Sequence, residues 1–222
     1  MPTPSNLAGR LTRYSMDALA AGSALAAKVH NVIPLGSQNA LVSWQSDAPP
    51  DLSNTSIEDI RSYMFFLQNE HYSIVCNDGS IIQMSFKVKR GDVVHHRLCF
   101  LPCPVAFDQA ELLQDSLYDV VERNLGRVDY DLIRYRGAIR FDYDPLAATD
   151  SHPSSHVTIN FNETRVPVGR SLDARTFIKF VDRNFISNRE NMKSIDFGMT
   201  GDDTPDVLAS VDRPLPHLFW HI

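Results

Sequence analysis

The amino-acid sequence predicts an α+β fold, in which an antiparallel sheet built from β-meanders carries helices packed mainly on one face. Helical and strand segments follow one another without the regular βαβ alternation that a parallel sheet requires. The clearest strand segment alternates polar and apolar residues, as half-buried antiparallel strands do. No boundary signal divides the chain, so we expect one domain over residues 1–222, with 1–50 as a helical N-terminal elaboration.

The composition is that of an ordinary globular protein. The chain has 222 residues, of which 43% are hydrophobic and 22% charged. No apolar run approaches the roughly 20 residues needed to cross a membrane, so we expect no membrane partner. Three cysteines cannot all pair, which favours a reducing, cytoplasmic location. The net charge of −6 argues against loose binding to nucleic acid, but it leaves room for a local basic cleft within residues 87–97.

The N-terminal third is predicted to contain two helices and a short strand. Hydrophobic periodicity predicts the first helix from Leu7 to about His30. Residues 39–44 form a strand candidate, and Ser56 can cap the second helix. The buried face of that second helix is expected to consist of Ile57, Ile60, Tyr63, Met64 and Leu67.

The strongest β pattern runs from residue 72 to residue 105. Asn-Asp-Gly at 77–79 is a strong turn signal. Residues 81–89 then alternate between apolar and polar, and Arg-Gly-Asp at 90–92 turns the chain back into residues 93–101. We therefore expect a three-stranded antiparallel meander.

The second half is predicted to add two helices, further strands and an apolar tail. A helix is expected at 109–125, with Leu112, Leu113, Leu117, Val120 and Val121 facing inward. Strands are expected at 138–143 and 156–161, and 164–168 is a further candidate. Ser171 or Asp173 caps a last helix, whose core stripe is Phe177, Phe180, Val181 and Phe185. The apolar tail at 215–222 is expected to dock on the sheet or on a partner.

A polar cluster between residues 140 and 165 is the most informative feature of the chain. Alternation along a strand puts Arg140, Asp142 and Asp144 on one face. The same rule groups His156, Thr158 and Asn160 on one face of the next strand. If the two strands pair, a cation, two carboxylates, an imidazole and an amide converge.

These residue types suit acid–base chemistry on a phosphate ester. His156 and His152 would act as general base and acid, because an imidazole titrates near neutral pH. Asp142 or Asp144 would fix the tautomer of the imidazole. The remaining candidates are ligand-binding residues that stabilise negative charge or hold the substrate: Arg140, Arg165 and Asn160.

This inventory suits cleavage of an RNA phosphodiester, in which the 2′-hydroxyl of the substrate attacks. The chemistry needs no cofactor, although three carboxylates could instead hold a divalent metal: Asp142, Asp144 and Asp150. Cys99 and Cys103, with His152 and His156, could in principle form a zinc site. The cluster could equally be the solvated face of an ordinary sheet.

No glycine-rich phosphate loop, no G-x-S-x-G elbow and no His-Glu-x-x-His motif is present. An alternative to an enzyme is a non-catalytic binding or assembly subunit, which the apolar tail and the acidic net charge suggest. In that case the apolar tail would dock on a partner protein or on a second copy of the chain.

The segments RFDYD at 140–144, HPSSH at 152–156, RVPV at 165–168 and FIKFVDRNF at 177–185 resemble a bacterial family defined by a domain of unknown function, number 2290. The resemblance is strongest over residues 138–186 and begins at about residue 60. It does not cover residues 1–50. It implies a bacterial cytoplasmic protein and no particular activity. Such families often occur among phage-defence genes, and an Asp…His-Pro…His layout also occurs in some small toxin-like proteins. On that basis we expect a toxin-like or defence nuclease, or, in the alternative, a binding or assembly subunit of a multi-protein defence complex.

Overall fold

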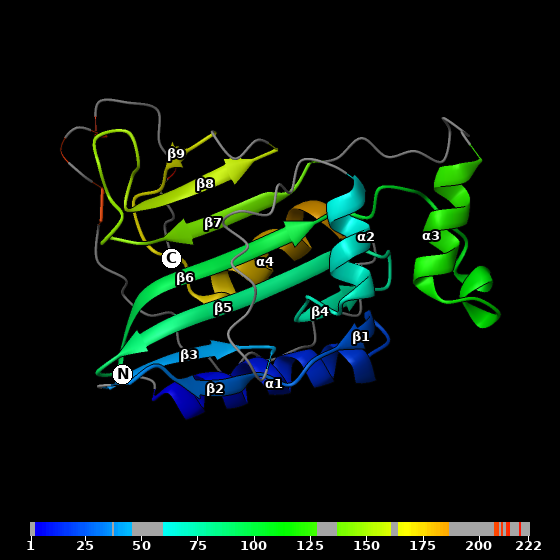
Figure 1. Ribbon diagram of the computed structural model, residues 1–222, viewed down its shortest axis with the longest axis horizontal. Coiled ribbons are helices and arrows are strands. Elements are labelled where there is room, and N and C mark those ends of the chain that lie inside the picture. The colour runs from blue at the N-terminus through cyan, green and yellow to red at the C-terminus, as the bar shows by residue number, and fades with distance from the viewer. Residues whose placement is uncertain are drawn as a thin grey trace.

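The computed structural model describes residues 3–36, 38–45, 60–127, 137–160, 164–186, 207–208, 210, 212–213 and 218. Over these residues the α+β prediction is confirmed, with four α-helices, one short 3-10 helix and a nine-stranded sheet that does not close into a barrel (Figure 1). No helix among these residues is long and apolar enough to cross a membrane.

Every strand pair in the sheet is antiparallel. The main path runs β1–β4–β5–β6–β7–β8–β9, while β3 pairs with β5 and β2 pairs with β3. The bounds are β1 Ala24–Ala27, β2 Asn31–Pro34, β3 Asn39–Ser43, β4 Ile74–Cys76, β5 Ile81–Lys89, β6 Asp92–Leu101, β7 Ile139–Tyr143, β8 Ser155–Ile159 and β9 Val166–Pro167.

The N-terminal segment is less helical than predicted. Helix α1 spans Pro4–Ala20 and begins where the Thr3 side chain accepts a hydrogen bond from the Asn6 N–H at 3.3 Å. The predicted continuation to His30 was wrong, because Gly22 takes a positive φ of 68° and the chain then enters β1. Residues 1–50 therefore supply three strands of the common sheet as well as one helix.

The predicted meander is confirmed as β4, β5 and β6. The turn between β4 and β5 places Gly79 at a φ of 81°, a conformation that glycine adopts readily. A Cβ at this position would also lie 2.9 Å from the Phe107 ring, so the turn needs glycine for space as well.

The two middle helices differ in detail from the prediction. Helix α2 spans Ile60–Gln68 and buries Tyr63 and Phe66, while Ile60 is exposed and Ser56 lies outside the described residues. The helix expected at 109–125 is divided into a 3-10 turn, Gln109–Leu113, and α3, Leu117–Gly126. The division falls at Ser116, whose side chain accepts a hydrogen bond from the Asp119 N–H and so begins a new helix. Leu113, predicted to face inward, is 86% exposed.

The C-terminal elements follow the prediction closely. Helix α4 spans Ala174–Phe185, and its cap is Asp173, which accepts a hydrogen bond from the Thr176 N–H at 2.8 Å. Of the apolar tail only Leu218 is described. Its N–H donates to the Pro167 carbonyl at 2.9 Å, and its carbonyl accepts from the Gly169 N–H at 2.8 Å. At this residue the tail lies beside the chain's own β9 segment.

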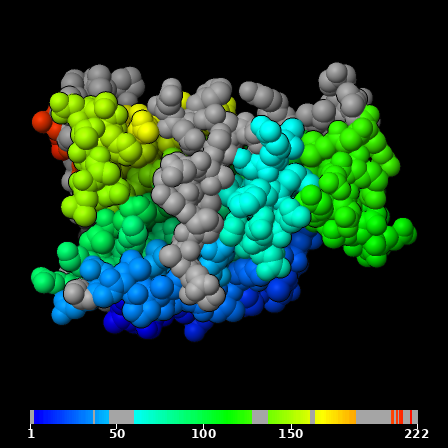
Figure 2. All heavy atoms as spheres, in the orientation of Figure 1, coloured from blue at the N-terminus to red at the C-terminus, as the bar shows by residue number. Residues whose placement is uncertain are grey.

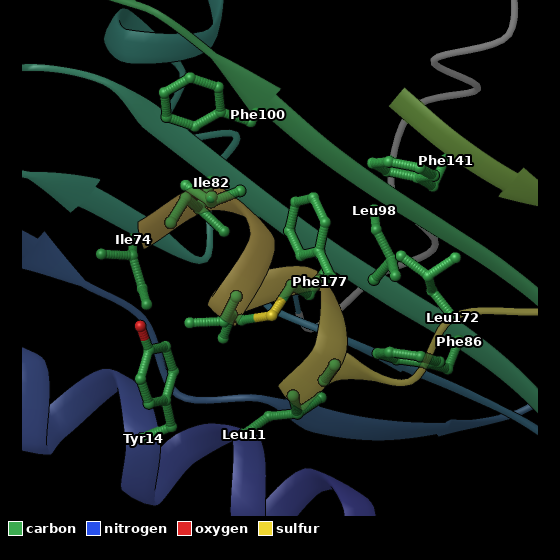
Figure 3. Close-up of a cluster of buried hydrophobic side chains, with 14 of the residues drawn as sticks. Leu11, Tyr14, Ile74, Ile82, Phe86, Leu98, Phe100, Phe141, Leu172 and Phe177 are labelled. Carbon is green, nitrogen blue, oxygen red and sulfur yellow. The ribbon is translucent and has the colours of Figure 1, made fainter. Parts of the chain in front are cut away.

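The sheet separates two hydrophobic cores. The larger core lies between one face of the sheet and the two longest helices, α1 and α4 (Figure 3). This arrangement is the one expected for helices packed mainly on one face. Its centre contains Phe141, Phe177, Met84 and Leu98, and full burial of such a side chain stabilises the fold by about 1.5–3 kcal/mol. The second core lies on the opposite face under α2, which stands in front of the sheet in Figure 1.

Candidate functional site

The face of the sheet that carries α2 is apolar near that helix. Over β5 to β8 the same face carries rows of polar side chains. Its middle row joins Ser85, Arg97, Asp142 and His156, and each residue lies directly opposite the next on the neighbouring strand. Neighbouring strands are about 4.8 Å apart, and equivalent rows are about 7 Å apart along a strand. We call this set the polar face, and it consists of Gln83, Ser85, Lys87, His95, Arg97, Cys99, Arg140, Asp142, Asp144, His156 and Thr158.

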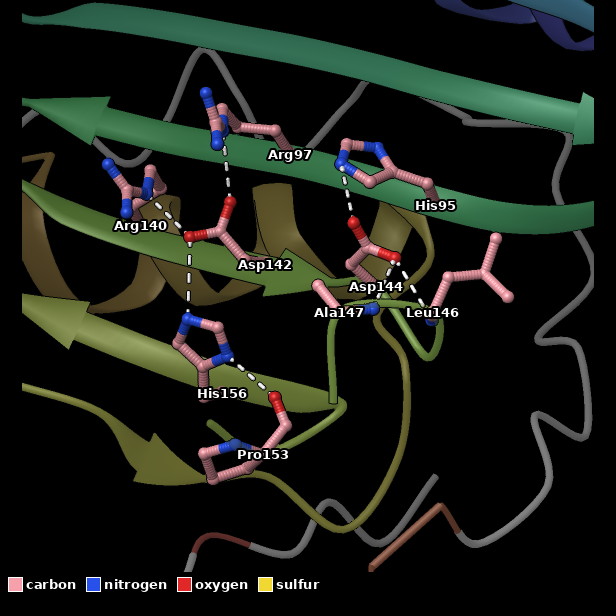
Figure 4. Close-up of polar contacts among 9 residues, drawn as sticks. All are labelled: His95, Arg97, Arg140, Asp142, Asp144, Leu146, Ala147, Pro153 and His156. Atoms are coloured by element: carbon pink, nitrogen blue, oxygen red, sulfur yellow. Dashed lines mark hydrogen bonds and ion pairs between the residues drawn. The ribbon is translucent and has the colours of Figure 1, made fainter. Parts of the chain in front are cut away.

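Asp142 is the centre of the polar face (Figure 4). Its Oδ1 accepts a hydrogen bond from Arg97 Nε at 3.0 Å, and its Oδ2 accepts one from Arg140 Nε at 2.5 Å. Burial raises the pKa of the Asp142 carboxyl, but the charges of Arg140 and Arg97 outweigh burial and leave the pKa below its ordinary value. Asp142 is therefore an ionised carboxylate held by two arginines.

The ring of His156 has a fixed orientation beside this carboxylate. Its Nδ1 lies 3.0 Å from the Pro153 carbonyl, which can only accept, so Nδ1 carries the hydrogen. Nε2 lies 3.7 Å from Asp142 Oδ2 (Figure 4). Burial lowers the pKa of His156 despite the opposing effect of Asp142, so the ring is neutral at neutral pH. Neutral His156 thus has its basic nitrogen, Nε2, within the polar face.

His152 extends the site toward the solvent. Its ring meets the His156 ring edge to face, with the ring centres 4.8 Å apart, and its side chain is half-buried. Burial lowers the pKa of His152, and the charge of exposed Arg165 lowers it further. The loop between β7 and β8 thus holds His152 against His156, and Arg165, which directly precedes β9, is near enough for its charge to act on His152.

Asp144 lies one row from Asp142 and closes the turn after β7. Its Oδ1 accepts hydrogen bonds from the N–H groups of Leu146 at 3.1 Å and Ala147 at 3.3 Å. Its Oδ2 lies 3.9 Å from His95 Nε2. The described contacts of Asp144 thus orient it toward this turn and toward His95.

Asn160 is placed differently from the expectation. It follows the last residue of β8 and takes a positive φ of 63°, which ends the strand alternation that grouped it with His156. Its side-chain amide occupies the space beside Gly137, because a Cβ built there would lie 1.1 Å from Asn160 Oδ1. The amide therefore packs at the far end of β7 and does not join the row of His156 and Asp142.

The prediction of the site omitted Arg97 and His95, which β6 supplies. The available signal was the alternation within 93–101, which puts both residues on one strand face. His95 and His96 are neighbours in β6 and therefore point to opposite faces of the sheet. His96 is buried on the opposite face, where its Nε2 accepts a hydrogen bond from the Leu172 N–H at 3.0 Å.

Among the described residues, no three His, Cys, Asp or Glu side chains lie close enough together to hold a metal ion. Cys99 and Cys103, two of the zinc ligands considered, are buried in the apolar core beneath α2. This part of the chain thus gives no support to a zinc site or to a three-carboxylate metal site.

Comparison with known proteins identifies a family and no closer relative. No curated protein and no solved structure matches the chain. The model of one family, described as uncharacterized conserved protein (DUF2290), matches residues 25–220. The match therefore includes β1 to β3, which the resemblance seen in the sequence did not reach. The chain belongs to the DUF2290 family of uncharacterized conserved proteins.

Proposed function

We propose that this protein cleaves RNA phosphodiester bonds, with His156 as general base and His152 as general acid. The observation that carries the proposal is the orientation of neutral His156. The Pro153 carbonyl fixes its Nδ1–H, and this leaves Nε2 as the basic nitrogen in the row of Arg97 and Asp142. A positioned imidazole of this kind contributes about 10²–10⁴-fold to a proton-transfer step.

The reaction would proceed in one displacement. His156 Nε2 removes the proton from the ribose 2′-hydroxyl, and the 2′-oxygen attacks the phosphorus. The bond from phosphorus to the 5′-oxygen then breaks, and protonated His152 gives that oxygen a proton. The products are a 2′,3′-cyclic phosphate and a free 5′-hydroxyl. Arg97 and Arg140 supply positive charge near the phosphate, where negative charge develops in the transition state.

The proposed roles predict a bell-shaped dependence of the cleavage rate on pH, because the base must be neutral and the acid protonated. The pKa of His152 lies below its ordinary value of 6.5, so the acid is fully protonated only on the acidic side of neutrality. Optimal cleavage is thus expected below about pH 6.5.

Expression in a bacterial host tests the proposal, including its toxin-like or phage-defence form. Induced wild-type protein should arrest growth and fragment cellular RNA. The variant His156→Asn should do neither, because the Asn amide retains a donor near Pro153 and lacks the basic nitrogen. Growth arrest with intact RNA would contradict the proposal, as would equal RNA fragmentation by the variant.

A second candidate is a non-catalytic binding or assembly subunit. The burial of the site favours it, since Arg140, Asp142 and His156 are only 7%, 6% and 2% exposed. Such a cluster could serve mainly to hold β6, β7 and β8 together. Normal growth and intact RNA with the wild type, together with co-purification of a specific partner, would support this candidate.

A further inference from the structure

At the exposed end of the polar face, where β5 and β6 pair, two side chains that the proposed reaction does not use, Lys87 and His95, lie beside Arg97. Lys87 lies directly opposite His95, and Arg97 lies two residues further along β6 on the same face. Among the described residues Lys87 is exposed and forms no ion pair, while Arg97 and His95 are only partly buried. A substrate approaching from solvent therefore reaches these three side chains before it reaches His156.

The ring of His95 supplies an independent sign of an absent ligand. Its Nε2 faces Asp144, but its Nδ1 is buried and has no hydrogen-bond partner within the part of the chain that the structure describes. An unpaired buried polar atom costs about 1–3 kcal/mol, and such atoms often mark functional positions. An anionic oxygen between Lys87 and Arg97 could accept a hydrogen bond from this nitrogen when it carries a proton.

The net positive charge of the polar face favours binding of an anion. On the polar face three cations, Lys87, Arg97 and Arg140, stand against two carboxylates, Asp142 and Asp144, an excess of one positive charge in a chain whose net charge is −6. Lys89 adds little to this excess, because Asp92 lies directly opposite it.

We propose that Lys87 and His95 form a second phosphate subsite, which binds the phosphate next to the one that is cleaved, and that Arg97 is shared between the two phosphates. This inference rests on the proposed RNA function and names its substrate as single-stranded RNA of at least two phosphates. The row of Lys87 lies about 7 Å from the row of Asp142 and His156 along the strands. A flexible single strand can place adjacent phosphates on the two rows.

The test uses Lys87→Gln, which removes one exposed charge from the intact chain and leaves the acid–base residues unchanged. The matched control is Lys179→Gln, because Lys179 is exposed on α4, on the opposite side of the sheet. Binding is measured with a 2′-O-methyl octanucleotide, which cannot be cleaved. Cleavage is measured with an RNA octanucleotide and with a dinucleoside monophosphate, which has a single phosphate.

One phosphate contact on a single strand contributes about 0.7 to the slope of log affinity against log salt concentration. Lys87→Gln should therefore reduce the magnitude of this slope by about 0.7. The ratio of wild-type to variant affinity for the octanucleotide should then be about fivefold larger at 0.1 M salt than at 1 M salt. Lys87→Gln should raise the KM of octanucleotide cleavage and leave dinucleotide cleavage unchanged, while Lys179→Gln changes neither.

Equal binding by the Lys87 and Lys179 variants, with a wild type that binds RNA, would overturn the subsite alone. Equal loss of dinucleotide and octanucleotide cleavage would also overturn it, because Lys87 would then act on the cleaved phosphate. A wild type that does not bind the 2′-O-methyl octanucleotide and cleaves neither substrate would overturn both the subsite and the proposed function.

Discussion

Replacing Asp142 by Asn should strongly destabilise the fold, because Asp142 is the only described carboxylate bonded to both Arg97 and Arg140. The side chains of Asp142 and Arg140 are each 9% exposed, and that of Arg97 is 18% exposed. Removing one partner from a buried ion pair costs about 3–5 kcal/mol, since the remaining charge loses the opposite charge beside it. The Asn oxygen can still accept from one arginine, so we expect a loss near the lower limit, about 3 kcal/mol.

The assay is urea unfolding of the purified variant beside wild type, supported by thermal melting. A loss of about 3 kcal/mol corresponds to a melting temperature lower by about 6–12 °C for a chain of this size. The control is Asp92→Asn, an exposed carboxylate on β6, whose change should stay within about 0.5 kcal/mol.

The same variant also tests the ionisation of Asp142. A carboxyl group whose pKa is lowered on folding stabilises the fold above its unfolded pKa, and the stabilisation is lost as pH falls through the folded pKa. The difference in stability between wild type and Asp142→Asn should be constant from about pH 5 to 7 and should shrink in stronger acid. Equal stability of the Asp142 and Asp92 variants at pH 7 would refute this description of the polar face.

Three further predictions concern stability, each measured by urea unfolding. Thr158→Val should leave stability unchanged or raise it by about 1 kcal/mol, because the buried Thr158 hydroxyl has no hydrogen-bond partner among the described residues; a marked loss would contradict this. Phe177→Ala should cost about 3–5 kcal/mol by leaving a cavity in the larger core, while Leu113→Ala at an exposed position should cost little; similar losses would contradict the packing described. Burial lowers the pKa of His96 to about 3, so stability should fall from about pH 6.5 toward that value as the unfolded chain gains a proton, by up to about 1.4 kcal/mol per pH unit. His96→Gln, which keeps an acceptor for the Leu172 N–H, should remove this contribution, and an unchanged slope would contradict it.

Local patterns were sufficient to predict most of the fold. The β4–β6 meander follows from the alternation in 81–89 and from the turn at Gly79, and both are properties of neighbouring residues. The end of α1 was missed because helical periodicity continues past Gly22, whereas pairing of β1 with β4 decides the structure there. Such pairing joins residues about 50 positions apart and leaves little signal within residues 24–27.

The part of the candidate site that lies on the hairpin of β7 and β8 could be predicted from the sequence. Alternation within each segment predicted that His156 and Asp142 would share a face if the two strands paired; β7 and β8 do pair, and the register puts these residues directly opposite each other. The contribution of β6 could not be derived in this way, because Arg97 reaches Asp142 from 45 residues away along the chain. Asn160 was misplaced because a single left-handed residue ends the alternation, and Asn adopts that conformation more readily than most residues.

Cleavage of RNA by the purified chain tests the central proposal most directly. The measurement compares wild type with His156→Asn on a single-stranded RNA and identifies the ends of the fragments. We predict fragments with 2′,3′-cyclic phosphate and 5′-hydroxyl ends, formed about 10²–10⁴-fold more slowly by the variant. No cleavage by a folded wild type, or equal cleavage by the two proteins, would contradict the proposed function.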